Sequence, residues 1–276
     1  MVIVAFGTST PEAGVGIVAA FKGEKAIALG NIVGSNIANI GLILGLTSLL
    51  RPLGVKKSIF KRELPIMLIC TFLLYIMSLD LLISRLDGLI FLGLFLVFFL
   101  ISYKGGKKDY DFKELQDFSF QGFLKNTTSL LVVGSVCMMS LVGVAVGANL
   151  MVKGGVGLAK IFGVSSWIIA ITVFAVGTSL PELAASLAAS FKKMPSISVG
   201  NIIGSNIFNI LFILGTVALI RPIKIEQSYL RFEYLFLIFI TILLIVFMKT
   251  KYRISRWEGF LLFLLYIFFV LLITGR

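Results

Sequence analysis

The sequence predicts an all-α protein that crosses a membrane several times and is built from two related halves. Of its 276 residues, 58% are hydrophobic, which is more apolar surface than a soluble domain of this size can bury. Several apolar runs with few or no charges approach, with their flanks, the ~20 residues that a helix needs to cross a bilayer. These runs lie near 65–79, 88–103, 230–248 and 260–273.

An internal repeat covers most of the chain. A shift of 170 residues aligns Ala5–Pro52 with Ala175–Pro222 without a gap, and about half of the aligned positions are identical. Apolar helices can share Leu and Ile by chance, but they do not share Pro, Glu, Asn and Ser in register by chance. The repeated motifs read GTS-x-PE, GN-I-x-GSNI-x-NI and a closing Arg-Pro.

The apolar runs predict about nine membrane segments. They fall near 1–21, 26–50, 63–80, 87–103, 126–158, 165–191, 196–220, 229–249 and 256–274. Five spans separate the middles of the two GTSxPE motifs, and an odd number gives the two copies opposite orientations across the membrane. This is the inverted-repeat plan of secondary transporters, here with two five-helix halves. We expect a first repeat at 1–103, a linker loop at 104–124 and a second repeat at 125–276.

The positive charge of the chain indicates its orientation in the membrane and does not indicate that it binds nucleic acid. The net charge is +12, and most Lys and Arg lie in short connections between apolar segments. The positive-inside rule places the richest of these in the cytoplasm. They are 51–62, the central loop at 104–125, 192–193 and 249–256. We therefore expect a multi-pass integral protein of the cell membrane, and we interpret Cys70 and Cys137 as reduced cysteines buried in helices.

Each GTSxPE motif places an acid beside a helix breaker inside an apolar segment. Proline and glycine interrupt the helix and free backbone carbonyls, and such backbone is tolerated at membrane depth only where it is buried or lines a cavity. An acid at this depth costs at least ~2–3 kcal/mol and marks a functional site by default. The acids are Glu12 and Glu182, and the neighbouring hydroxyl and carbonyl oxygens belong to Thr8, Ser9, Thr178 and Ser179.

The second motif supplies neutral polar groups. Ser35 and Asn39 are four residues apart and share one helix face, as do Ser205 and Asn209. The alternative interpretation of these four residues is hydrogen bonding between helices, which needs no ion. For the other asparagines of the motif we favour a structural role as caps or in packing at a tight turn. These are Asn31, Asn36, Asn201 and Asn206.

An inverted repeat would bring both acids to one central site. Two carboxylates with hydroxyl, carbonyl and amide oxygens form an all-oxygen cage with a formal charge of about −2, which suits a hard cation such as Ca²⁺. The sequence has no histidine, so a histidine metal site is excluded, and no thiolate stands in these motifs to bind zinc or copper. No nucleophile–base arrangement or phosphate-binding loop is found, so we expect neither an enzyme nor a cofactor.

The two motifs, in two inverted copies, resemble the alpha-repeats of the sodium/calcium exchanger family within the calcium/cation antiporter superfamily. The resemblance covers the whole chain and implies antiport of Ca²⁺ against Na⁺ by alternating access. It implies that Glu12 and Glu182 are the central ion carboxylates and that Asn39 and Asn209 close the middle of the site. It further implies oxygen ligands from Thr8, Ser9, Thr178, Ser179, Ser35 and Ser205, and backbone carbonyls from Ala5 and Ala175 at flanking Na⁺ sites.

Two departures from the family pattern stand out. Potassium-dependent relatives carry an aspartate at the position of Asn209, so the resemblance implies no co-transport of K⁺ here. The second repeat also has a long slanting helix and the front half of a broken helix from Leu141 onward. The 170-residue shift would place their partners before Met1, so we expect that roughly 45 residues of the first repeat are missing and that this half is truncated.

Two alternatives to Na⁺/Ca²⁺ exchange remain at this stage. Two carboxylates in one cavity resist joint ionisation, so protons can compete with the metal and the protein could be a cation/proton exchanger. The other is a truncated remnant that does not transport, or a subunit whose missing helix comes from another chain.

Overall fold

The computed structural model describes residues 2–109 and 130–275, and within them it is almost entirely helical. The elements of the first half are the helices α1 (Val2–Thr8), α2 (Thr10–Lys22), α3 (Lys25–Ala38), α4 (Gly45–Leu50), α5 (Leu64–Met77) and α6 (Arg85–Asp109), with the π-helical turns η1 (Asn39–Leu44) and η2 (Ile59–Glu63). The π-turns interrupt otherwise continuous helices, a feature that is common near functional sites.

From the helix break onward the second half largely repeats the elements of the first, and it has further helical elements before the break. It begins with α8 (Leu130–Phe162), and the rest are α9 (Ser166–Ile169), η3 (Ala170–Phe174), α10 (Ala175–Thr178), α11 (Leu180–Phe191), α12 (Pro195–Phe208), η4 (Asn209–Leu214), α13 (Gly215–Ile220), α14 (Gln227–Tyr229), η5 (Leu230–Tyr234), α15 (Leu235–Lys249) and α16 (Arg256–Thr274). The sequence repeat is therefore also a repeat of local structure, with π-turns η1 and η4 at matching positions.

Most helix boundaries lie close to the expected segments, but α8 ends at Phe162 rather than near 158. Helix α6 continues to Asp109, beyond the expected end of its segment at 103. The division into two repeats and a linker at 104–124 stays a prediction. The remainder of that linker, including its cytoplasmic placement, lies outside the described residues. Within 2–109 and 130–275, six helices are long and apolar enough to cross a membrane, or up to seven when a bent pair is counted as one. The count of nine segments stays a prediction.

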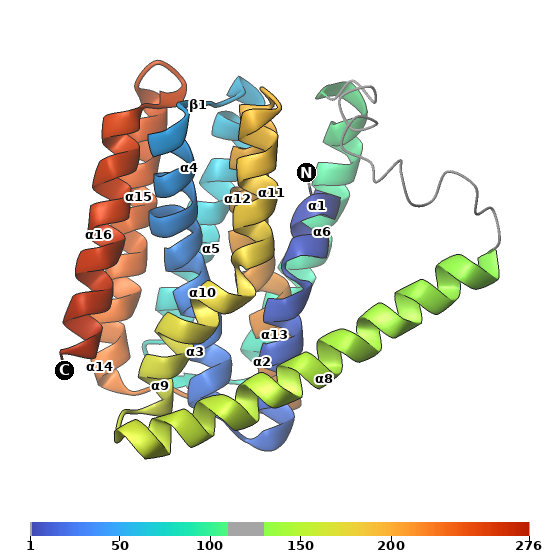
Figure 1. Ribbon diagram of the computed structural model, residues 1–276, viewed down its shortest axis with the longest axis vertical. Helices are drawn as coiled ribbons and strands as arrows, with labels where there is room; N and C mark the ends of the chain where they lie inside the picture. Colours follow the sequence, from blue (N-terminus) through green and yellow to red (C-terminus); the bar gives the residue numbers. More distant parts are fainter. Residues whose placement is uncertain (1, 110–129, 276) are drawn as a thin grey trace.

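The long central helices of the two halves run in opposite directions. In Figure 1 the chain rises from α3 to α4, then descends from α12 to α13. Short antiparallel strand pairs join the halves crosswise. Strand β1 (Leu53–Gly54) pairs with β4 (Arg253–Ile254), and β2 (Leu82–Ile83) pairs with β3 (Ile223–Lys224). Each strand pair thus links a connection in the first half to a connection in the second half.

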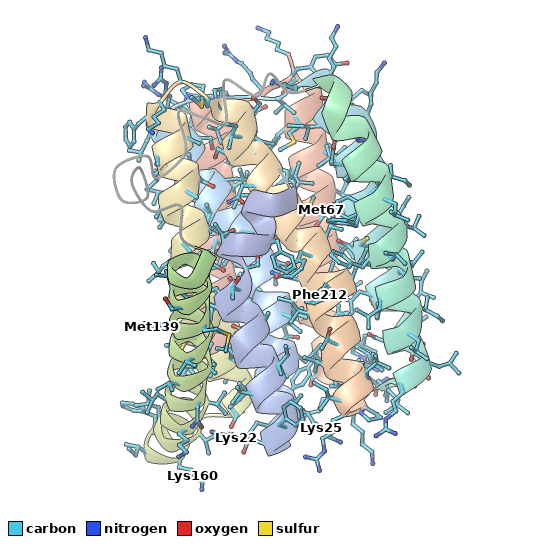
Figure 2. All side chains as sticks on the ribbon, turned by 90° about the vertical axis from the view of Figure 1, so that its right-hand side faces the viewer. Lys22, Lys25, Met67, Met139, Lys160 and Phe212 are labelled. Atoms are coloured by element: carbon cyan, nitrogen blue, oxygen red, sulfur yellow. The ribbon has the colours of Figure 1, made fainter. Side chains whose placement is uncertain are left out.

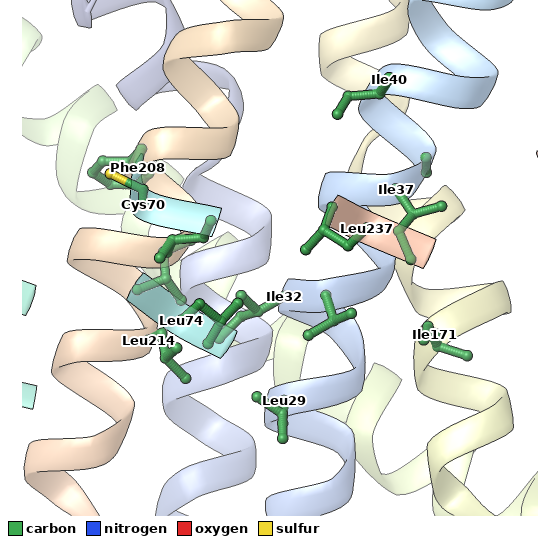
Figure 3. Packing of buried hydrophobic residues seen from close by; sticks show 14 of the residues in the cluster. Leu29, Ile32, Ile37, Ile40, Cys70, Leu74, Ile171, Phe208, Leu214 and Leu237 are labelled. Carbon is green, nitrogen blue, oxygen red and sulfur yellow. The ribbon is translucent and has the colours of Figure 1, made fainter. Parts of the chain in front are cut away.

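The two central helices form the core of the bundle. The runs from α3 to α4 and from α12 to α13 are almost wholly buried, whereas α6, α8 and α16 are mostly exposed. Figure 3 shows the apolar side chains that pack between these helices, among them Ile32, Cys70 and Phe208. Cys70 is buried, as expected, and the side chain of Cys137 lies outside the described part.

The close approach of helix α3 to the π-turn η3 depends on a glycine. A Cβ on Gly34 of α3 would lie 2.5 Å from the carbonyl oxygen of Ile171 in η3, so no larger residue fits without moving the backbone.

The outer surface of the bundle is apolar between two charged ends. Large exposed hydrophobic side chains cover the peripheral helices, for example Leu86, Met139 and Leu271. In Figure 2 the labelled lysines Lys22, Lys25 and Lys160 all lie at one end of the molecule. An apolar belt of this kind is stable against lipid and not against water, and together with the long apolar helices it identifies an integral membrane protein.

Candidate functional site

Two helix breaks meet in the middle of the bundle. Ser9 ends α1 and Ser179 ends α10, each with non-helical backbone angles, and a new helix starts at once with Pro11 or Pro181 in its first turn. At the second break the helix axis bends by 40°. The acids Glu12 and Glu182 therefore lie in the first turns of α2 and α11. The N-terminus of a helix carries a partial positive charge, which stabilises a carboxylate there.

Both carboxylates are fully buried and are bound by serines of the opposite half. Glu12 and Glu182 each have 0% of their surface exposed. The Ser9 hydroxyl donates to Glu182 Oε1 at 2.7 Å, and the Ser179 hydroxyl donates to Glu12 Oε1 at 3.0 Å. Because each serine reaches across to the acid of the other repeat, the two breaks form one site rather than two.

Four buried oxygen atoms in this site have no hydrogen-bond partner among the described residues. They are Glu12 Oε2, Glu182 Oε2, Asn39 Oδ1 and Asn209 Oδ1. All four residues are 0% exposed. Buried polar atoms are nearly always paired, so each exception requires an explanation. Unpaired oxygens that include two carboxylates are the type of ligand that a hard cation prefers.

The amide groups of Asn39 and Asn209 are oriented across the interface between the halves. Asn39 Nδ2 donates to Asn206 Oδ1 at 2.9 Å, and Asn209 Nδ2 donates to Asn36 Oδ1 at 3.1 Å. With each amide nitrogen bound in this way, the oxygen on the same side chain is left for the site. Asn206 is itself fixed, because its Nδ2 donates to the backbone oxygen of Asn36 at 3.3 Å.

A second set of hydroxyl contacts surrounds the acids. The Ser205 hydroxyl donates to Glu182 Oε1 at 3.4 Å, and Ser35 Oγ lies 3.4 Å from Thr178 Oγ1. The threonines reach asparagines of the other repeat: Thr178 donates to Asn31 Oδ1 at 3.2 Å, and Thr8 donates to Asn201 Oδ1 at 3.4 Å. This network is neutral, so the charge of the site comes from the two carboxylates.

The alanines of the expected site are buried beside the helix breaks. The Ala5 carbonyl accepts from the Ser9 amide at 3.0 Å and from the Thr8 hydroxyl at 3.3 Å, and the Ala175 carbonyl accepts from the Ser179 amide at 3.2 Å. The Ala5 carbonyl thus accepts two hydrogen bonds, whereas the Ala175 carbonyl accepts this one bond and keeps a lone pair for a further contact.

The structure brings the expected site residues into one region. Glu12, Glu182, Asn39 and Asn209 supply the unpaired oxygens, and the rest of the predicted set lies in the hydrogen-bond network around them. The described residues hold no group of three or more His, Cys, Asp or Glu side chains that could hold a metal ion. An ion here would depend on neutral oxygens as well as on the two acids.

Sequence reasoning missed the role of four asparagines. Asn36 and Asn206 are not merely caps or packing residues, because they bind the amides of Asn209 and Asn39. Asn31 and Asn201 accept from the site threonines. Their presence in both copies of the repeat was the available signal.

The chain matches known proteins over nearly its whole length. The family model described as sodium/calcium exchanger protein matches residues 1–104 and 132–275. A putative antiporter, CaxA of Alkalimonas amylolytica, is 37% identical over 97% of this chain and 84% of its own length. The sodium/calcium exchanger MaX1 of Methanosarcina acetivorans is 30% identical over 99% of this chain and 87% of its own length.

The chain is also similar to solved structures of a sodium-calcium exchanger. The sodium-calcium exchanger NCX_Mj, from crystals soaked with Na⁺ and Sr²⁺, is 32% identical to this chain, with a TM-score of 0.71. The alignment covers 96% of this chain and 83% of that chain.

Proposed function

Because the chain belongs to the sodium/calcium exchanger family of cation antiporters, we propose that it exchanges Ca²⁺ for Na⁺ across the membrane by alternating access. The observation that carries this proposal is the set of four unpaired buried oxygens on Glu12, Glu182, Asn39 and Asn209. A charge of about −2 balances one Ca²⁺, and the amide oxygens add neutral ligands for a cation that takes about 6–8 oxygens in all.

Sodium competes for the same oxygens. The carbonyls of Ala5 and Ala175 and the hydroxyls of the flanking serines and threonines form smaller groups of neutral oxygen on either side of the acids. These hydroxyls belong to Thr8, Ser9, Ser35, Thr178, Ser179 and Ser205. Several Na⁺ ions in these groups would replace one Ca²⁺, and this mutual exclusion couples the two gradients.

The antiparallel central helices support an inverted repeat, in which the two halves expose the site to opposite sides in turn. The site lies where α1 meets α2 and where α10 meets α11, so a tilt of the broken helices relative to α3 and α12 would open one side and close the other.

The test is ion flux in proteoliposomes that contain the purified protein. An outward Na⁺ gradient should drive ⁴⁵Ca²⁺ uptake, and an outward H⁺ gradient of equal size should not. Uptake driven by H⁺ alone would favour a cation/proton exchanger, whose basis would be protonation of the paired carboxylates. The Glu12→Gln/Glu182→Gln double variant is the control for leak, because both charges of the site are removed and the side-chain volumes are kept.

A further inference from the structure

One row of buried hydroxyls, outside the ion site, has no use in the mechanism above. The side chains of Thr47, Ser186, Ser190 and Ser198 are at most 2% exposed, and within the described chain their hydroxyl oxygens have no hydrogen-bond partner. We call these four residues the hydroxyl seam. A buried hydroxyl without a partner destabilises the fold, so four in one region need an explanation.

Three other buried hydroxyls in helices are satisfied by a hydrogen bond to their own helix backbone. Thr71, Ser78 and Thr241 each donate to the backbone carbonyl four residues earlier, at 2.9, 2.7 and 2.7 Å. This bond satisfies a serine or threonine inside a helix without any outside partner. The residues of the hydroxyl seam lie in helices as well and do not form it, so their hydroxyls are directed elsewhere.

The hydroxyl seam extends from the ion site to one end of the molecule. Glu182, Ser186 and Ser190 follow at intervals of four residues and share one face of α11. Helix α11 packs against α12 and α4, which carry Ser198 and Thr47. At the deep end, Ser205 of α12 donates to Glu182, so these faces of α11 and α12 meet.

At its outer end the hydroxyl seam reaches Arg51. The Arg51 guanidinium donates from Nη1 to the carbonyls of Ser190 at 3.0 Å and Phe191 at 3.3 Å, at the C-terminus of α11. This end carries the β1–β4 strand pair, whose first strand starts two residues after Arg51. A fixed positive charge at this point repels cations but not neutral molecules.

The positions related to the hydroxyl seam by the 170-residue repeat provide an internal comparison, because they carry no hydroxyl groups. The residues at the matching positions are Gly16, Ala20, Ala28 and Val217. Gly16 lies against Val217, since a Cβ on Gly16 would be 3.4 Å from Val217 Cγ2. Ala20 and Ala28 are at most 1% exposed, so burial at these matching positions is as complete as in the hydroxyl seam. The two sets of positions therefore differ in polarity and not in burial.

We infer that the hydroxyl seam binds a single row of water molecules. This row connects the ion site at Glu182 with the aqueous solution at the end of the molecule where Arg51 lies. Internal waters typically occupy places where buried polar groups lack protein partners, and they form about three hydrogen bonds each. The row gives water a route by which it enters and leaves when ions lose or regain their hydration shells. Arg51 repels cations from this route. Water can therefore pass along the hydroxyl seam without a leak of ions that would dissipate the gradients.

Cysteine labelling tests this inference without any transport assay, so the result does not depend on which ions the protein exchanges. In a Cys70→Ala/Cys137→Ala background, Ser190→Cys and Ser198→Cys are compared with Ala20→Cys and Ala28→Cys. The probes are neutral methyl methanethiosulfonate and a cationic trimethylammonium methanethiosulfonate. We expect the neutral probe to label the seam cysteines at least about tenfold faster than the controls, because a buried thiol reacts only where water and reagent reach it.

The cationic probe then reports on Arg51. It should label the seam cysteines slowly, and addition of Arg51→Gln should raise that rate without a change at Ala20→Cys or Ala28→Cys. Equal labelling of seam and control cysteines by the neutral probe would overturn the inference, because the hydroxyl seam would then be as dry as its apolar counterpart.

Hydrogen–deuterium exchange of the unmodified protein provides a second test that needs no variant to fold. We expect the amides of residues 183–190 in α11 to exchange faster than those of 13–20 in α2. Equal protection of the two helices would also contradict a water-filled hydroxyl seam.

Discussion

The Ser9 hydroxyl in the first repeat lies 2.7 Å from Glu182 Oε1 in the second and donates a hydrogen bond to it. The reverse bond, from Ser179 to Glu12, is 3.0 Å long. Each acid therefore keeps one oxygen bound to the protein, and its other oxygen lacks a protein partner among the described residues. This division fixes the direction of both carboxylates before an ion arrives, which lowers the ordering cost of binding.

Removal of one acid should abolish Ca²⁺ transport. In Glu12→Gln or Glu182→Gln the site loses one of two charges that offset desolvation of a divalent ion. A lost charged contact of roughly 2–3 kcal/mol weakens Ca²⁺ binding by about 30- to 150-fold. Equilibrium ⁴⁵Ca²⁺ binding measures the loss, and exposed Glu226→Gln is the control with the same chemical change. Unchanged Ca²⁺ affinity in either single variant would contradict the site assignment.

Acid pH should weaken Ca²⁺ binding. Both carboxylates are buried close to the same site, and each proton that binds there removes a charge that attracts the metal. The affinity should therefore fall as the pH is lowered from about 8 to about 5 and recover when the pH is raised again, because protons and Ca²⁺ compete for the same oxygens. Calorimetric titration with Ca²⁺ at several pH values measures this effect. A flat profile would mean that the carboxylates do not share the ion.

Exchange should not require potassium. Asn209 is neutral, so the two acids are balanced by one Ca²⁺ and leave no charge for a further monovalent cation. Na⁺-driven ⁴⁵Ca²⁺ uptake should be the same when K⁺ is replaced by choline. In Asn209→Asp, which adds a third carboxylate at this position, uptake should become sensitive to K⁺. If Na⁺-driven ⁴⁵Ca²⁺ uptake by the unmodified protein stops without K⁺, the charge balance proposed for the site is wrong.

The Asn206 side chain should set the ion affinity through Asn39 without touching the ion itself. In Asn206→Leu the Asn39 amide nitrogen loses its acceptor, and the amide is free to turn its NH₂ group toward the cation. The loss of one hydrogen bond of about 1–2 kcal/mol should weaken Ca²⁺ binding by roughly 5- to 30-fold. Asn206→Asp keeps an oxygen acceptor and should lose less. If both variants lose the same affinity, Asn206 has only a packing role.

The helices and the two helix breaks could be predicted from the sequence for physical reasons, whereas the role of Glu12 and Glu182 as ion ligands stays a prediction. Apolar runs of membrane length leave little choice of secondary structure, and the Pro-Glu pairs at 11–12 and 181–182 mark helix breaks at a depth where an acid is costly. The shared site of Glu12 and Glu182 follows from the repeat once the halves are inverted.

The hydrogen bonds between the halves could not be predicted in the same way. Asn36 and Asn206 look like ordinary polar residues in a tight turn, and their bonds to Asn209 and Asn39 depend on the register between α3 and α12. The extension of α6 to Asp109 was missed because its last turns contain charge and glycine, which local propensity assigns to a loop.

The location of a bound divalent ion tests the central claim most directly. Crystals of the protein soaked with Sr²⁺, which scatters anomalously and resembles Ca²⁺, should give one strong anomalous peak in the middle of the bundle. We predict that this ion contacts Glu12 Oε2 and Glu182 Oε2 together with an amide oxygen of Asn39 or Asn209, and that a high Na⁺ concentration removes it. A peak that contacts only one of the two acids, or that lies outside the four unpaired oxygens, would contradict the account.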